Sequence, residues 1–313
     1  MALDLIFIAL GLALLYYGGE LLVTGSIRIS QTLKIPPFVI GATIVGFGTS
    51  APELAVSIMA GMEGAPEVAV ANVIGSNVAN VGLVLGLTAL LIPLTIQDKR
   101  FKKEMLPLIF STFLILYLAW DLQLVRWEGF LMMFFLAVYL WHALRQKDDS
   151  EIDLEEDDAS LAKRGMAVQG FFIVAGLILL VLGAHFLVTG GVSIAKSMGI
   201  SEWFIGITII AIGTSLPEIV SSLMAAKRGH GELAIGNVFG SNIFNILMVL
   251  GLTSILNPLQ IREAIHPDLI YTTAFTCLLL ILIRLEHNLS KRDGVLLLVG
   301  YFSYVGLKGI GII

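Results

Sequence analysis

The sequence is poor in charged residues and has almost no cysteine. Only 14% of its 313 residues are Asp, Glu, Lys or Arg, whereas 57% are hydrophobic and the mean hydropathy is +0.91. This composition excludes an ordinary soluble domain and is typical of a chain with several membrane spans. The single cysteine, Cys277, lies in an apolar run, which excludes an internal disulfide framework. No nucleophile-base constellation and no cofactor motif is recognisable, so we expect neither an enzyme nor a bound cofactor.

The apolar stretches predict ten membrane-spanning helices. The first has no basic leader and no small-residue cleavage site, so we interpret it as a retained span, and we expect no additional soluble domain. The fourth, fifth and ninth are only about 16 residues long and require tilted neighbours or local thinning of the bilayer. By the rule of about 20 residues per span, the stretches are 3–27, 37–61, 68–94, 105–121, 127–144, 167–192, 202–226, 231–257, 268–284 and 294–313.

The basic residues support this count and give an orientation. If the N-terminus lies outside, 15 of the 19 Lys and Arg residues fall in inside loops, as the positive-inside rule requires. We therefore predict a multi-pass protein with both termini extracellular. The small size and the expected lack of a soluble regulatory domain favour the plasma membrane of a prokaryote. The inside set is Arg28, Lys34, Lys99, Arg100, Lys102, Lys103, Arg145, Lys147, Lys163, Arg164, Lys227, Arg228, Arg284, Lys291 and Arg292.

The chain repeats itself at a constant offset, which we call the repeat offset. It is the separation between Glu53 and Glu218, and the same separation relates Asn80 to Asn245 without a gap. Of the aligned positions in Gly41–Leu54 and Gly206–Ile219, 8 of 14 are identical. The chain therefore consists of two related halves.

The repeat predicts how the halves lie in the membrane. Five spans per half is an odd number, so the two halves enter the membrane from opposite sides, as in the inverted repeats of secondary transporters. We predict an all-α membrane protein in which 1–145 is the first five-helix repeat and 165–313 the second. The intervening 146–164 is an acidic cytoplasmic linker, and a regulatory Ca²⁺ site there lacks the spacing of an EF-hand loop.

Each half carries a proline next to a glutamate inside an apolar span. Pro52 has no N–H to give to the carbonyl of Gly48, and its ring crowds that carbonyl, so the helix must open. Pro217 does the same to Gly213. An opened turn within a bilayer is tolerated where the freed carbonyls face protein, water or a bound ion. We therefore interpret the two stretches, Gly48–Glu53 and Gly213–Glu218, as halves of one cation site with broken helices at the centre.

The two glutamates are surrounded by oxygen donors. Glu53 and Glu218 have no basic residue nearby in their own spans, so an external cation is the expected counter-charge. On a helix, the hydroxyls four and three residues before each acid share its face; they are Thr49 and Ser50, then Thr214 and Ser215. Donors of this kind suit Ca²⁺ and Na⁺ and argue against zinc or copper.

The next span of each half carries a polar stretch, Asn72–Asn80 and Asn237–Asn245. Ser76 and Asn80 are four residues apart and face the same way, as do Ser241 and Asn245. Polar residues of this kind also join helices, and for Asn72, Asn77, Asn237 and Asn242 the two interpretations remain equally open.

These motifs resemble those of the cation/calcium exchanger superfamily, and in particular prokaryotic sodium/calcium exchangers. The resemblance rests on Gly-Thr-Ser-Ala-Pro-Glu with Gly-Ser-Asn-Val-Ala-Asn, and on Gly-Thr-Ser-Leu-Pro-Glu with Gly-Ser-Asn-Ile-Phe-Asn. It implies a ten-helix antiporter that presents one set of sites alternately to Ca²⁺ and Na⁺, with the lipid bilayer and these ions as its partners. Neither nucleic acid nor an obligatory protein partner is expected.

The resemblance also implies a role for each matching residue. Ca²⁺ would be held by Glu53 and Glu218 with the carbonyls of Thr49 and Thr214. The expected Na⁺ ligands are Ser50, Ser76, Ser215, Ser241 and the main chain of Gly46 and Ala211, while Asn80 and Asn245 complete the central ring. Relatives that also carry K⁺ have an aspartate at the position of Asn245, as do some prokaryotic sodium/calcium exchangers, and the amide here argues against K⁺ dependence.

Several alternatives stay open at this stage. Proton/calcium exchange is disfavoured by Gly-Thr-Ser before the acid, but a buried glutamate can also titrate. A cation channel could use the same oxygens without needing two matched inverted halves. A second pair lies at the same offset, Glu20 and His185. Each residue either snorkels at a helix end or caps a neighbouring helix, or the two pair across the halves in one conformational state and tune the switch.

Overall fold

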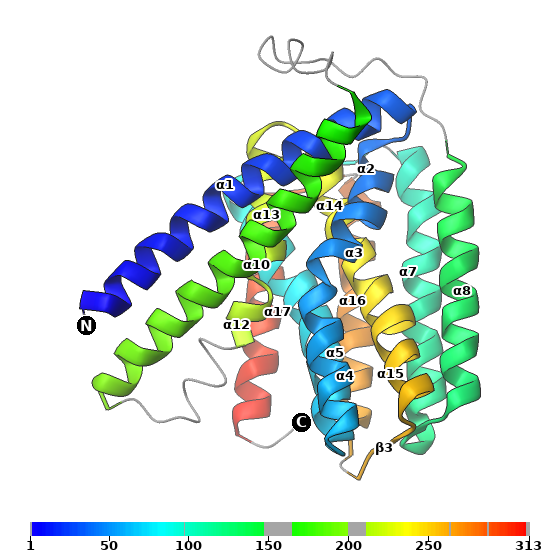
Figure 1. The fold of residues 1–313 in the computed structure, drawn as a ribbon. Coiled ribbons are helices and arrows are strands. Elements are labelled where there is room, and N and C mark those ends of the chain that lie inside the picture. The colour runs from blue at the N-terminus through cyan, green and yellow to red at the C-terminus, as the bar shows by residue number, and fades with distance from the viewer. Residues whose placement is uncertain are drawn as a thin grey trace.

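The computed structural model describes residues 2–96, 98–146, 165–199, 211–262, 264–286 and 288–310, and it is built from helices with four two-residue strands (Figure 1). The predicted linker, apart from Gln146, and the first part of the predicted span 202–226 lie outside the described residues. In the first half, the elements are α1 (Ala2–Leu33), α2 (Pro37–Ile40), the π-helix η1 (Gly41–Val45), α3 (Gly46–Thr49), α4 (Ala51–Met62), α5 (Pro66–Ala79), the π-helix η2 (Asn80–Leu85), α6 (Gly86–Leu91), β1 (Leu94–Thr95), α7 (Asp98–Leu118), the 3-10 helix η3 (Ala119–Asp121), β2 (Gln123–Leu124) and α8 (Arg126–Leu144).

The second half repeats these elements. At the repeat offset, the bounds of α4, α5, η2, α6 and α8 recur in α13, α14, η5, α15 and α17. The elements of the second half are α10 (Met166–Ser197), α12 (Ala211–Thr214), α13 (Leu216–Lys227), α14 (Gly231–Phe244), the π-helix η5 (Asn245–Leu250), α15 (Gly251–Leu256), β3 (Leu259–Gln260), α16 (His266–Glu286), β4 (Asn288–Leu289) and α17 (Lys291–Gly309).

The four short strands join the halves crosswise. β1 pairs antiparallel with β4, and β2 pairs antiparallel with β3. The repeat offset converts one of these ladders into the other, because Leu94 and Leu289 correspond to Leu259 and Leu124. Such reciprocal pairing is the signature of a two-fold relation between two similar units.

Local sequence signals set the helix starts. A proline lies in the first turn of α4, α5 and α13, where its missing N–H is not needed. At the start of α17, Ser290 Oγ accepts a hydrogen bond from the Asp293 N–H, and an Asp293 carboxylate oxygen accepts one from the Ser290 N–H, which closes a capping box. Glu128 accepts the corresponding bond from the Val125 N–H at the start of α8.

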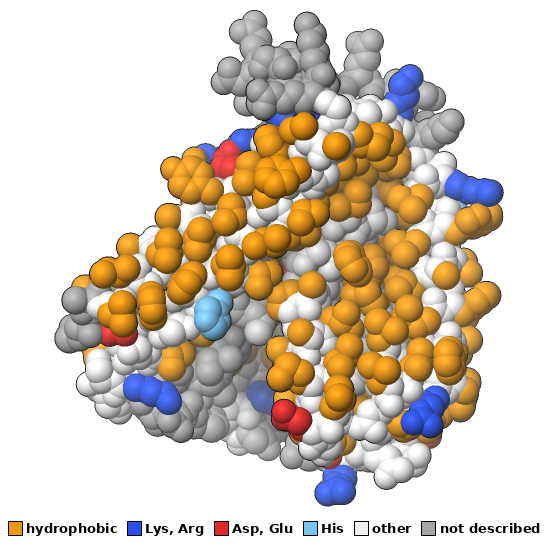
Figure 2. Space-filling view, viewed as in Figure 1, with side chains coloured by type: hydrophobic (Ala, Val, Ile, Leu, Met, Phe, Trp, Pro, Cys, Tyr) orange, Lys and Arg blue, Asp and Glu red, His pale blue; other side chains and the backbone are white. Residues whose placement is uncertain are grey.

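The described residues contain seven helices that are long and apolar enough to cross a membrane, or eight if the bent pair Pro37–Thr49 and Ala51–Met62 forms one span. The three spans that were predicted to be short are longer in the structure: α7, α8 and α16 have 21, 19 and 21 residues. α7 begins with charged residues from Asp98 onward, α8 gains Arg126, and α16 includes His266 and Glu286, all of which a hydropathy pattern leaves out. Hydrophobic side chains cover the visible flank of the molecule, and charged ones gather toward its ends, as a bilayer-embedded protein requires (Figure 2).

Two long helices, α1 and α10, lie side by side and cross obliquely over the rest of the bundle (Figure 1). Glycines face the partner helix at regular intervals: Gly11 and Gly18 in α1, and Gly176 and Gly183 in α10. A Cβ atom added to Gly183 would lie 2.8 Å from the Leu15 nitrogen, and one added to Gly18 would lie 2.8 Å from the Leu180 nitrogen. The two backbones are therefore in direct contact, as in small-residue helix pairs in membranes.

Candidate cation site

The helix opens at the predicted position in both halves. α3 ends at Thr49, Ser50 adopts φ −79° and ψ 0°, and α4 begins at Ala51, with a bend of 43° between the two helical segments. In the second half α12 ends at Thr214, Ser215 adopts φ −89° and ψ 2°, and α13 begins at Leu216. The proline-induced break is confirmed, and it places each glutamate in the first turn of a new helix.

Both carboxyl groups are buried at the centre of the bundle. Glu53 is 1% exposed and Glu218 is fully buried, and they are close enough for their charges to interact. Ser76 Oγ donates to Glu53 Oε1 at 3.4 Å. The structure therefore brings two acids from different halves of the sequence into one site, with serine and threonine hydroxyls around them.

Several buried oxygen atoms at this place have no hydrogen-bond partner among the residues that the structure describes. A buried polar atom without a partner is costly, so a cluster of them indicates a ligand that supplies the missing interactions. All of these atoms belong to residues that the sequence motifs single out. Seven atoms share this state: Ser50 Oγ, Glu53 Oε2, Asn80 Oδ1, Ser215 Oγ, both carboxylate oxygens of Glu218, and Asn245 Oδ1.

Hydroxyl groups join the first broken helix to the second half. Thr49 Oγ1 lies 3.2 Å from Ser241 Oγ and donates to Asn237 Oδ1 at 3.2 Å. Asn237 Nδ2 in turn donates to Ser221 and Ser222 of α13. Asn237 thus connects the turn at Thr49 with α13, the helix that carries Glu218 in its first turn.

Asn72 has the matching position in the first half. Its Nδ2 donates to the main-chain oxygen of Glu53 at 3.1 Å and to Ser57 Oγ at 2.9 Å. The motifs alone left Asn72 and Asn237 undecided, and Ser57 and Ser222 were not among the predicted site residues. The signal of these two serines is present in the sequence, because each lies one helical turn after its glutamate and the repeat offset relates them.

The remaining predicted ligands lie at the ends of the short helices α3 and α12. Gly46 begins α3, and its carbonyl oxygen accepts hydrogen bonds from the Ser50 N–H at 3.1 Å and from Thr49 Oγ1 at 3.5 Å. Ala211 is the first residue of α12, and Thr214, which is half-buried, is the last. The side chain of Ala211 lies outside the described residues.

A cavity of about 230 Å³ reaches the two turns from one side. Pro52 and Pro217 line it together with Gly213 and Thr214, and α10 contributes His185. His185 therefore lies near the mouth of the site. Its predicted partner is elsewhere in this conformation, because the Glu20 carboxylate forms an ion pair with Arg228, whose guanidinium also donates to Thr24.

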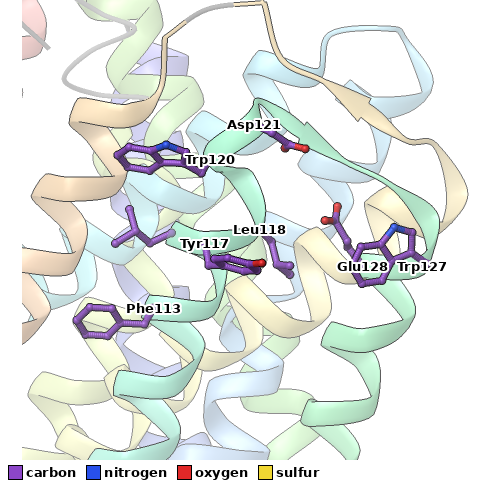
Figure 3. Close-up of a pocket in the computed structure, with 8 residues that line it drawn as sticks. Phe113, Tyr117, Leu118, Trp120, Asp121, Trp127 and Glu128 are labelled. Carbon is purple, nitrogen blue, oxygen red and sulfur yellow. The ribbon is translucent and has the colours of Figure 1, made fainter.

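A second cavity, of about 560 Å³, lies where α7 ends and α8 begins (Figure 3). Phe113, Tyr117, Trp120 and Trp127 line it with Asp121 and Glu128. Aromatic side chains of this kind gather at the level of the lipid headgroups. None of the predicted cation ligands lines this cavity.

A metal site based on several strong ligands is not found in the described ranges. They contain no group of three or more His, Cys, Asp and Glu side chains arranged to hold a metal ion. The central site instead combines two carboxylates with neutral hydroxyl and amide oxygens, a donor set that suits Ca²⁺ or Na⁺.

Apolar spans, a broken helix at the centre and a buried cluster of oxygen donors together define a multi-pass membrane transporter of cations. The family comparison agrees: residues 3–145 and 169–309 match the family described as sodium/calcium exchanger protein. The chain belongs to this family.

Individual relatives cover nearly the whole chain. The putative antiporter CaxA of Alkalimonas amylolytica is 39% identical over 97% of this chain and 98% of its own length. The sodium/calcium exchanger MaX1 of Methanosarcina acetivorans is 33% identical over 97% and 98% of the two chains. Among solved structures, the sodium-calcium exchanger NCX_Mj soaked with 10 mM Na⁺ and zero Ca²⁺ superimposes with a TM-score of 0.84 at 31% identity, covering 97% of this chain and 98% of that one.

Proposed function

We propose that this protein is an antiporter that exchanges Ca²⁺ for Na⁺ across the membrane by alternating access, without K⁺. The observation that carries the proposal is the set of seven unpartnered buried oxygens around Glu53 and Glu218. The names of MaX1 and NCX_Mj, both sodium/calcium exchangers, support the choice of ions.

We assign the ligands as the sequence motifs suggest. Glu53 and Glu218 hold Ca²⁺ with the carbonyls of Thr49 and Thr214. Bound Na⁺ ions are held by Ser50, Ser76, Ser215, Ser241 and the main chain of Gly46 and Ala211, while Asn80 and Asn245 complete the central ring around both kinds of ion. The burial of these side chains on both sides of the carboxylates supports one shared site, so the two ions compete for it.

The charge of the site explains why exchange is coupled. Two carboxylates carry a charge of about −2, which one Ca²⁺ neutralises, whereas bare carboxylates resist crossing a bilayer. The unoccupied site therefore remains open to the same side of the membrane until Ca²⁺ or Na⁺ binds. If more than two Na⁺ replace one Ca²⁺, the cycle moves net charge and responds to voltage. Asn245 adds no third charge, which supports K⁺ independence.

The proposed membrane arrangement is ten spans in two inverted five-helix repeats, 1–145 and 165–313, joined by the cytoplasmic linker 146–164. The equal offsets of the elements and the crosswise strand pairs support it. The distribution of Lys and Arg favours extracellular termini in a cell membrane. We expect transport to need only the ions and the bilayer, with no cofactor and no protein partner.

Proton/calcium exchange is the second candidate, because buried carboxyl groups can carry protons instead of Na⁺. Purified protein in liposomes separates the candidates. We expect Ca²⁺ uptake driven by an imposed Na⁺ gradient, unchanged by K⁺ and absent with a pH gradient alone. Uptake driven by pH alone would favour protons, and passive Ca²⁺ conductance without a counter-ion would favour a channel.

A further inference from the structure

The amide groups of Asn80 and Asn245 have a defined orientation. Both side chains are buried, with 1% and 0% exposure, and each Nδ2 donates a hydrogen bond while each Oδ1 has no partner in the described part of the chain. An amide has an oxygen end that attracts a cation and an NH₂ end that repels it. The oxygen end is the one left for the site, so something must keep these two amides from turning over.

The groups that hold them come from the opposite half. Asn80 Nδ2 donates to Asn242 Oδ1 at 3.1 Å, and Asn245 Nδ2 donates to Asn77 Oδ1 at 3.1 Å. The repeat offset converts one pair into the other. The hydrogen bonds that orient the two amides therefore cross between the halves: Asn242 orients Asn80, and Asn77 orients Asn245.

Asn77 and Asn242 are themselves fixed by main-chain carbonyl groups. Asn77 Nδ2 donates to the Asn242 main-chain oxygen at 3.3 Å, and Asn242 Nδ2 donates to the Asn77 main-chain oxygen at 3.4 Å. A carbonyl accepts and never donates, so it dictates which end of each inner amide faces it. The inner amides must then present their oxygens to Asn80 and Asn245, whose NH₂ groups turn away from the site.

We propose, on the basis of the exchange function assigned above, that Asn77 and Asn242 are positioning residues for the cation site. Each keeps the amide oxygen of its crossed partner directed at the bound ion, and neither touches the ion itself. The π-helical turns η2 and η5 begin at Asn80 and Asn245, and such turns often mark functional positions in helices.

The test replaces each inner amide by leucine, which has a similar size and no polar atoms. Asn77→Leu and Asn242→Leu are each expected to weaken the apparent Ca²⁺ affinity about tenfold, because the outer amide can then turn its NH₂ toward the ion. An aspartate in place of the outer amide presents oxygen whichever way it turns. Asn245→Asp should therefore restore most of the affinity lost in Asn77→Leu, and Asn80→Asp should do so in Asn242→Leu.

The crossed pattern of rescue distinguishes a positioning role of the inner amides from a packing effect and from a simple effect of added charge. Asn80→Asp is not expected to rescue Asn77→Leu, although it adds the same charge as Asn245→Asp. Asn72→Leu, on the same helix as Asn77 but bonded to the main chain of Glu53, should be rescued by neither aspartate. Equal rescue by both aspartates, or leucine variants with unchanged affinity, would overturn the proposal.

Two measurements keep the outcomes distinct. Direct Ca²⁺ binding to the purified protein measures the affinity of the site without requiring transport. If Na⁺-driven uptake is absent but Ca²⁺ binding shows the crossed rescue, only the exchange function is overturned. Elution as a single folded species checks each variant. If a leucine variant does not fold, the alanine variant at the same position is tested in its place with the same aspartate variants, since alanine removes the same amide group.

Discussion

The central helices α5 and α14 and the long pair α1 and α10 are held together in opposite ways. In the apolar windows of the spans that contain α5 and α14, 78% and 89% of the residues are buried, against 33% and 28% in α1 and α10. Side-chain amides link α5 to α14, whereas glycines bring the backbones of α1 and α10 into contact. Hydrogen-bonded side chains require one geometry, while smooth small-residue surfaces permit sliding. We therefore expect the central helices to hold an ion and the outer pair to move during transport.

The largest expected effect is at the centre. Glu53→Gln and Glu218→Gln should each lower the apparent Ca²⁺ affinity by about 100-fold or more, since removing a charge beside a divalent cation in a poorly solvated site costs several kcal/mol. Na⁺-driven Ca²⁺ uptake by liposomes measures this. Glu63→Gln, at an exposed helix end, is the matched control. Full exchange by either central variant would remove the site assignment.

A change in the outer pair should affect movement and spare binding. The Cβ atom of Gly183→Ala would lie 2.8 Å from the Leu15 nitrogen and 2.9 Å from the Gly11 oxygen, so α1 and α10 must separate. Overpacking of this kind costs about 1–3 kcal/mol, and we expect a several-fold lower turnover with Ca²⁺ affinity within about twofold of the unmodified protein.

Gly170→Ala provides the control on the same helix, because a Cβ there meets no described atom within 4 Å. The sliding interpretation would be contradicted if both alanine variants changed turnover equally, or if Gly183→Ala changed affinity alone.

The ion pair between Glu20 and Arg228 connects the outer pair to the helix that carries Glu218, and its loss should have a smaller effect. It joins α1 to the end of α13, and its side chains are 26% and 27% exposed, so its contribution is about 0.2–1 kcal/mol. We expect Glu20→Gln, Arg228→Gln and the double variant to change turnover by the same small factor. Additive effects in this cycle would show that the two residues act independently.

The smallest effect is expected at the mouth of the site. His185 lines the cavity beside Pro52 and Pro217, but it supplies none of the unpartnered oxygens. His185→Gln should therefore change the apparent Ca²⁺ affinity by less than about twofold. A strong non-additive effect of Glu20→Gln with His185→Gln on transport and its pH profile would instead support a pair formed in another conformation.

The proline breaks and the repeat were predictable from the sequence because both are local or strictly periodic signals. Pro52 removes a backbone donor and crowds the carbonyl of Gly48, so the break is expected from the local sequence, and the repeat offset connects Glu53 to Glu218 without coordinates. The partner of Glu20 was not predictable, since Arg228 is 208 residues away and lies outside the repeated motif. The length of α7 was also underestimated, because its first turns are polar and extend beyond the apolar core.

The sequence by itself determined the chemical nature of the site: an apolar chain with two proline-broken acids and repeated hydroxyl and amide residues has few other uses for them. Only the tertiary structure decided which end of each buried amide is hydrogen-bonded and which end is left without a partner among the described residues. That orientation depends on main-chain carbonyls from the opposite half, and their position follows from packing the two halves together, which no local pattern encodes.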